Sequence, residues 1–124
     1  IDRSSAASDV YKRQTHSNYN FFSMHIFFNK LCKLLNIRRK QKAFHPNAQR
    51  INLDFGPKIY GFKRISKDKK QTIICITNLS SKPQKTKIDK NSGKIRNLLG
   101  SKMNIENRKF LVLKPFETVW LSNN

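Results

Sequence analysis

The sequence predicts a mainly β fold, an antiparallel Greek-key β-sandwich preceded by one amphipathic helix. Short alternating or continuous apolar segments recur between residues 49 and 121, separated by turn residues, as in sandwiches and Greek-key barrels. The apolar run Ile73, Ile74, Cys75, Ile76 lacks alternation, which is typical of a strand covered on both faces and indicates the centre of a sheet. Between residues 20 and 40, apolar residues recur at intervals of three and four, which indicates a helix.

Length and composition allow one small folded domain. The chain has 124 residues, of which 37% are hydrophobic and 10% aromatic, so it is too apolar to be disordered. We divide it into a leader at residues 1–14, a helical segment at residues 15–42 and a β domain at residues 43–124.

The leader, residues 1–14, does not share the residue pattern of the helical segment and the β domain. Its string SAASDVYKRQ resembles a translated cloning or sequencing adapter, so we exclude it from the fold. The corollary is that the reading frame is truncated and that a larger N-terminal portion is missing. A short disordered leader is the alternative interpretation.

The helical stripe between residues 20 and 40 is wide and aromatic. Its apolar positions are Met24, Phe27, Phe28, Leu31, Leu34 and Leu35. His25, Asn29 and Lys30 interrupt the apolar segment, which makes it too short to span a bilayer. We expect the stripe to pack against a neighbouring domain and expect no membrane partner, with a membrane-surface helix as the alternative.

The β domain begins after a turn at residues 43–48, because Pro46 forces its predecessor out of the helical region. Residues 49–55 alternate as a half-buried strand, and residues 58–65 form a second strand with Tyr60 and Phe62 on one face. Gly61 marks a bulge or a close approach. Residues 71–79 form the central strand after a charged hairpin loop at residues 66–70.

The remaining strands are shorter. We expect a weak strand at residues 84–89, whose lysines suit an exposed sheet edge. A turn is expected next at residues 91–93. We expect a strand at residues 95–99, a loop at 101–109 with Met103 and Ile105 pinned down, and strands at 110–113 and 118–121. Trp120 alternates with apolar neighbours, which favours core packing over a ligand platform.

No catalytic, cofactor-binding or metal-binding residue emerges from spacing. The histidines His16, His25 and His45 are far apart, and His45 beside Pro46 is interpreted as a turn residue that hydrogen-bonds backbone. A glycosidase needs two facing carboxylates, and no pair is indicated among the acids on outward strand positions or loops, which are Asp54, Asp68, Asp89, Glu106 and Glu117. Phosphate loops and nucleophile elbows are absent from the sequence.

The two cysteines, Cys32 and Cys75, fall in the predicted helix and the predicted central strand. Neither has a Cys or His at ligand spacing, so both are interpreted as small buried hydrophobic residues in a reducing compartment. This favours a cytoplasmic location, while a structural disulfide is the alternative.

The formal charge of +19, from 26 basic and 7 acidic residues, creates a field that attracts polyanions. The lysines are spread over almost every loop beside abundant Asn and Ile, the residue usage of an AT-rich genome. We therefore do not expect nucleic acid as the main partner. The alternative function is a small basic nucleic-acid-binding β module that uses Tyr60 and Phe62, and a carbohydrate-binding module is a third possibility.

Four separated motifs carry a family resemblance, in the order RRKQKAFHPNAQRINLDF, IYGFKRISKDKKQTIICITNLS, IRNLLG and FLVLKPFETVWL. With them the chain resembles the C-terminal end of sugar phosphorylases of the sucrose phosphorylase type, in the α-amylase superfamily (glycoside hydrolase family thirteen). The resemblance covers residues 22–121. It includes an AFHPNA-like turn, a strand ending in Asn-Leu-Ser, and a closing motif of Leu113, Pro115, Phe116, Trp120 and Leu121, in which Phe116 stands where Tyr is common.

The resemblance implies a role for each segment. Residues 15–42 correspond to the last helix of a missing N-terminal (β/α)8 barrel, and residues 43–124 to a non-catalytic C-terminal β domain that packs against it. The parent enzyme transfers a glucosyl unit from sucrose or a related α-glucoside to phosphate, or hydrolyses such a glucoside. Its catalytic and substrate-binding residues lie on the barrel, so no catalytic residue is carried over, no cofactor is implied, and this fragment alone is expected to be inactive.

Overall fold

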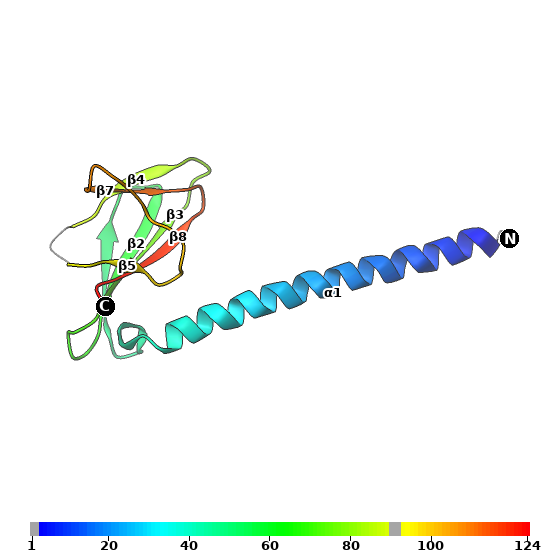
Figure 1. Cartoon of the computed structure of the whole chain (residues 1–124), viewed down its shortest axis with the longest axis horizontal. Helices are drawn as coiled ribbons and strands as arrows, with labels where there is room; N and C mark the ends of the chain where they lie inside the picture. Colours follow the sequence, from blue (N-terminus) through cyan, green and yellow to red (C-terminus); the bar gives the residue numbers. More distant parts are fainter. Residues whose placement is uncertain (1–2, 90–92) are drawn as a thin grey trace. The chain divides into compact units, whose positions relative to one another are not determined.

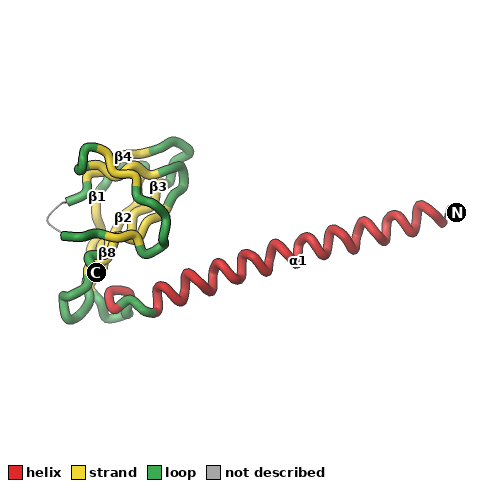
Figure 2. Tube along the Cα trace, viewed as in Figure 1, coloured by secondary structure: helices red, strands yellow, loops and turns green. Residues whose placement is uncertain are grey.

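The computed structural model describes the backbone of residues 3–89 and 93–124, and the side chains from residue 20 onward within those ranges. The predicted turn at Asn91 and Ser92 lies outside the described residues. The chain forms two compact units, Ile1–Asn36 and Ile37–Asn124. Figures 1 and 2 show the helix of the first unit and the strands of the second.

Helix α1 runs from Arg3 to Arg39. Its start lies well before the predicted start near residue 20, because residues 3–19 contain no proline or glycine to interrupt helix propagation. The helix thus includes residues 3–14 of the predicted leader. Taken by itself, α1 leaves its apolar side chains exposed, with Phe21, Met24 and Phe27 among the most exposed. None of the described helices has the length and hydropathy that a bilayer crossing needs.

The larger sheet has five strands in the order β1-β2-β3-β8-β5, and all its pairs are antiparallel. Its strands are β1 (Gln49–Asp54), β2 (Ile59–Ile65), β3 (Thr72–Asn78), β8 (Thr118–Ser122) and β5 (Arg96–Asn97). The apolar run of β3 therefore occupies the middle strand, as predicted. The 3₁₀ helix η1 (Lys42–Phe44) precedes β1, within the predicted turn.

The smaller sheet has three strands in the order β4-β7-β6, which are β4 (Gln84–Lys87), β7 (Phe110–Leu113) and β6 (Asn104–Glu106). β4 lies at its edge, as its lysines predict. β6 was predicted as loop, which was wrong: its isolated apolar residue Ile105 gives no alternation, and its pairing with β7 decides the conformation. Met103 packs against the core, whereas Ile105 is exposed.

The chain crosses between the two sheets four times after β3, which makes the antiparallel sandwich that the sequence predicted. The core between the sheets joins Ile59, Ile76, Val119 and Leu121 of the larger sheet to Leu111 and Leu113 of the smaller one. Gly61 on β2 confirms the predicted close approach. A Cβ atom there would lie 2.3 Å from the Phe55 ring, while the β1–β2 register continues through Gly61 without a bulge.

Candidate functional site

The face of the larger sheet opposite the inter-sheet core carries a second apolar cluster. On β3, Cys75 pairs with Phe62 of β2 on one side and with Trp120 of β8 on the other. Along each strand these three residues alternate with residues that point into the core between the sheets. We call this set the outer-face cluster, and its members are Ala43, Phe44, Phe62, Ile73, Cys75, Leu98 and Trp120. A sheet face with its own apolar cluster requires a cover.

The 3₁₀ helix η1 covers one part of the outer-face cluster. Ala43 is fully buried, and the Phe44 ring meets the Trp120 ring edge-on at a centroid distance of 4.9 Å. Arg64 of β2 holds this segment, since its Nε donates to the Ala43 carbonyl at 3.0 Å and its Nη2 to the His45 carbonyl at 2.6 Å. These contacts give the AFHPNA turn a structural role.

The part of the same face over β1 and β2 is left open. The Tyr60 and Phe62 rings lie 5.8 Å apart, and Tyr60 is 46% exposed. The Arg50 guanidinium sits 4.6 Å above the Phe62 ring and donates to the Tyr60 hydroxyl at 2.5 Å. The predicted placement of Tyr60 and Phe62 on one face is confirmed. An exposed tyrosine beside a half-buried phenylalanine with a stacked arginine is a surface suited to a protein partner.

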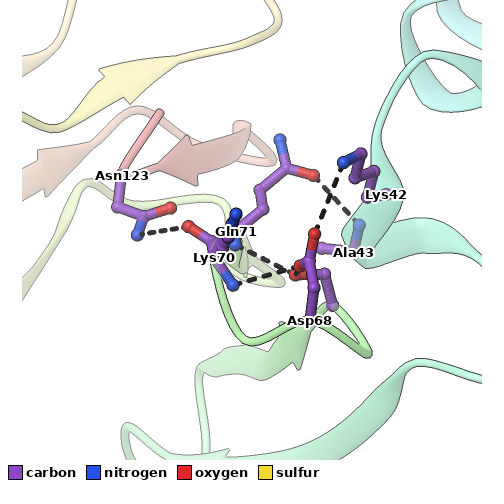
Figure 3. Close-up of polar contacts among 7 residues, drawn as sticks. Lys42, Ala43, Asp68, Lys70, Gln71 and Asn123 are labelled. Atoms are coloured by element: carbon purple, nitrogen blue, oxygen red, sulfur yellow. Dashed lines mark hydrogen bonds and ion pairs between the residues drawn. The ribbon is translucent and has the colours of Figure 1, made fainter.

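A polar network joins η1 to the loop between β2 and β3 (Figure 3). The side chain of Gln71 accepts from the Ala43 N–H at 3.0 Å and donates to the Gln41 side chain at 2.7 Å. Asp68 accepts from the Ser66 hydroxyl at 2.6 Å, from the Lys70 N–H at 3.1 Å and from Lys42 Nζ at 3.3 Å. These hydrogen bonds, the one from Ser66 first, lower the pKa of Asp68 to about 2.

Asn78, at the end of β3, is fully buried and links the two sheets. Its amide nitrogen donates to the carbonyls of Lys82 at 2.8 Å and Lys114 at 3.0 Å, and its side-chain oxygen accepts from the N–H and hydroxyl of Ser80. From the sequence alone, the Asn-Leu-Ser motif indicates only a family resemblance. Its physical role is to fix the chain where it leaves the larger sheet, before β4.

Three of the described acids have local partners. Asp54 accepts from the Gly56 N–H at 2.9 Å, Glu117 accepts from the Lys114 N–H at 2.7 Å, and Glu106 pairs with Lys85. A cavity of about 830 Å³ opens at the margin of the inter-sheet core, and its two carboxylates, Asp54 and Asp89, share the lining with lysines and core isoleucines. Among the side chains that the structure describes, those of residues 20–89 and 93–124, no three metal-ligating groups form a cluster.

Of the remaining candidate nucleophiles and bases, Cys75 and His45 have structural positions. Burial raises the pKa of the Cys75 thiol to about 12, against the opposing charges of Arg64 and Arg50, so it is no thiolate nucleophile. Cys32 and Cys75 are both free thiols. His45 Nδ1 accepts from the Asn47 N–H at 3.2 Å, which confirms its prediction as a turn residue. His25 is exposed on α1, and the side chain of His16 is outside the described part.

Two solved structures with a similar fold are an alpha-glucosyl transfer enzyme and an alpha-amylase. The alpha-glucosyl transfer enzyme XgtA matches with a TM-score of 0.57 and 16% identity over 73% of this chain. An alpha-amylase from H. orenii matches with a TM-score of 0.57 and 22% identity over 76% of this chain. The chain spans only 16% and 19% of the length of these two enzymes. No protein-family model and no curated protein sequence matches it.

Proposed function

We propose that this chain is a non-catalytic C-terminal β domain, with the last barrel helix, of an α-glucoside-acting enzyme of the α-amylase superfamily. The observation that carries the proposal is the fold shared with two enzymes of that kind, of which the chain matches only a small share.

In this proposal the outer face of the larger sheet docks against a (β/α)8 barrel. The η1 segment covers Ile73 and Trp120, and the barrel covers the part around Tyr60 and Phe62 that stays open. The exposed apolar side chains of α1, such as Phe27, Phe28 and Leu35, pack against the other elements of the barrel. The β domain then acts as a support.

The finer proposal is a sugar phosphorylase of the sucrose phosphorylase type, which transfers a glucosyl unit from sucrose or a related glucoside to phosphate. This finer proposal is supported by the four sequence motifs and by the order in which they occur. Several residues of these motifs also have a physical role in the structure. Ala43, the first residue of the AFHPNA turn, is buried, Asn78 and Ser80 close the central strand, and Trp120 packs on Phe44.

The direct test is to extend the reading frame upstream in the source DNA. The expected result is a series of barrel strands that carry an Asp nucleophile and a Glu acid. The extended protein, incubated with sucrose and phosphate, should release glucose 1-phosphate. Release of free glucose instead would keep the superfamily and replace phosphorolysis by hydrolysis, while an upstream sequence without barrel strands would contradict the proposal.

The docking face is tested in the extended protein with two matched variants. Tyr60 and Ile105 are each 46% exposed, but Tyr60 lies on the proposed docking face and Ile105 on the smaller sheet. Tyr60→Asp should lower the melting temperature of the barrel and speed its limited proteolysis, because a charge in an interface is costly. Ile105→Asp should have little effect. Equal effects of the two variants would contradict docking at this face.

A further inference from the structure

The loop between β2 and β3 lies beside the end of α1 and η1, and together they gather basic side chains. We call this set the basic junction, and its members are Arg38, Arg39, Lys40, Lys42, Lys67, Lys69 and Lys70. All seven side chains are exposed. They come from two segments that the sequence separates by more than twenty residues, and all belong to the same compact unit.

Specific contacts hold the two segments together. Lys42 Nζ lies 3.3 Å from Asp68, the Gln71 amide donates to Gln41 at 2.7 Å, and the Ala43 N–H donates to Gln71 at 3.0 Å. The sheet end braces the loop from the other side, where the Asn123 amide donates to the Lys70 carbonyl at 3.4 Å. The basic junction is thus a product of folding and not a flexible charged tail.

The charged side chains of this surface are almost all positive. Asp68 is the single acid in residues 38–42 and 66–71, and its oxygens already accept from Ser66, Lys70 and Lys42. The other side chains of both segments are basic, Gln or Ser, so neither segment offers an apolar group for insertion into a bilayer. Exposed lysines without apolar neighbours suit a hydrated polyanion whose charges are regularly spaced.

We propose that the basic junction binds the phosphate backbone of nucleic acid without sequence preference. This role goes beyond the proposed support of a catalytic barrel. It also differs from a module that reads bases with Tyr60 and Phe62, since those rings lie on the outer face, where Arg50 covers Phe62 and donates to the Tyr60 hydroxyl. Lysine contacts to phosphates release counterions, so binding must weaken steeply with salt.

The test uses the full chain and a fluorescently labelled 30-nucleotide single-stranded DNA of mixed sequence, with fluorescence anisotropy over a salt series. The variant Lys40→Gln/Lys67→Gln/Lys70→Gln removes three charges from the basic junction. The matched control Lys58→Gln/Lys82→Gln/Lys102→Gln removes three exposed lysines elsewhere. Circular dichroism melts check that both variants stay folded.

Loss of three phosphate contacts should reduce the slope of log Kd against log salt concentration by about 2, at roughly 0.7 per contact on a single strand. The control should keep the wild-type slope. Equal losses in both variants would overturn the proposal, because a diffuse field would then explain binding. The proposal is also overturned if the variant of the basic junction binds phosphatidylserine vesicles more weakly than the wild type does, while its binding to DNA is unchanged.

Discussion

Phe44 packs edge-on against Trp120, with ring centroids 4.9 Å apart. Trp120→Ala should lower the free energy of unfolding by about 2 kcal/mol, less than a fully buried aromatic, because Trp120 is only half-buried. Urea unfolding measures the change. Phe116→Ala is the control, since Phe116 is 67% exposed and should change stability little. A Trp120→Ala protein as stable as the Phe116→Ala protein would contradict the role of this contact.

Gly61→Ala should destabilise the domain by about 1–3 kcal/mol, the usual range for overpacking a core. The new Cβ would lie 2.3 Å from the Phe55 ring, so that ring must move. The double variant Gly61→Ala/Phe55→Leu tests the cause, because the smaller side chain leaves room for the methyl group. Thermal melts should show the double variant losing less than the sum of the two single variants. Strict additivity would refute the steric explanation.

Asn78→Asp should be more destabilising than Asn78→Ala at neutral pH. Aspartate keeps the shape of the residue but replaces the Nδ2 donor that faces the carbonyls of Lys82 and Lys114. A buried carboxylate facing two acceptors costs more than a small cavity. Protonation of the new carboxylate restores a hydrogen-bond donor. The difference in stability between the two variants should therefore become smaller as the pH falls. Urea midpoints at pH 7 and pH 4 make the comparison.

Asp68 makes stability depend on pH in the acid range. Its pKa falls from 3.8 to about 2 in the folded chain, so its carboxylate stabilises the fold above about pH 4. That contribution is lost as the pH falls toward 2. The Asp68→Asn variant should therefore be less stable than the wild type at pH 6, with the difference disappearing near pH 2. Urea unfolding at several pH values from 2 to 6 measures the difference in stability between the wild type and Asp68→Asn. A difference that does not change with pH would contradict the role of the Asp68 carboxylate.

The two thiols should differ in reactivity. Cys75 is 4% exposed and its pKa is about 12, whereas Cys32 is half-buried on α1. A thiol reagent at pH 8 should modify one cysteine quickly and the second only in urea, because the thiolate is the reactive form. Cys32→Ser should leave only the slow phase. A rapid phase in that variant would show that the centre of the sheet is accessible.

Periodicity located most of the elements. The alternation of Ile51 and Leu53, the apolar run that begins at Ile73 and the spacing around Leu31 are local signals, and they predicted two strands and a helix where the structure has them. The early start of α1 at Arg3 and the short strand β6 were missed. Neither has a periodic apolar pattern, and β6 exists because it pairs with β7.

By itself, the sequence determined the antiparallel strands and the central position of β3, because these follow from the pattern of apolar residues along neighbouring positions. Only the tertiary structure decided which residues meet across the strands. It placed Phe44 on Trp120, put Asn78 between the sheets, and brought Lys42 beside the loop of Lys67 and Lys70. Contacts between distant segments depend on strand register and loop closure, which composition and spacing do not encode.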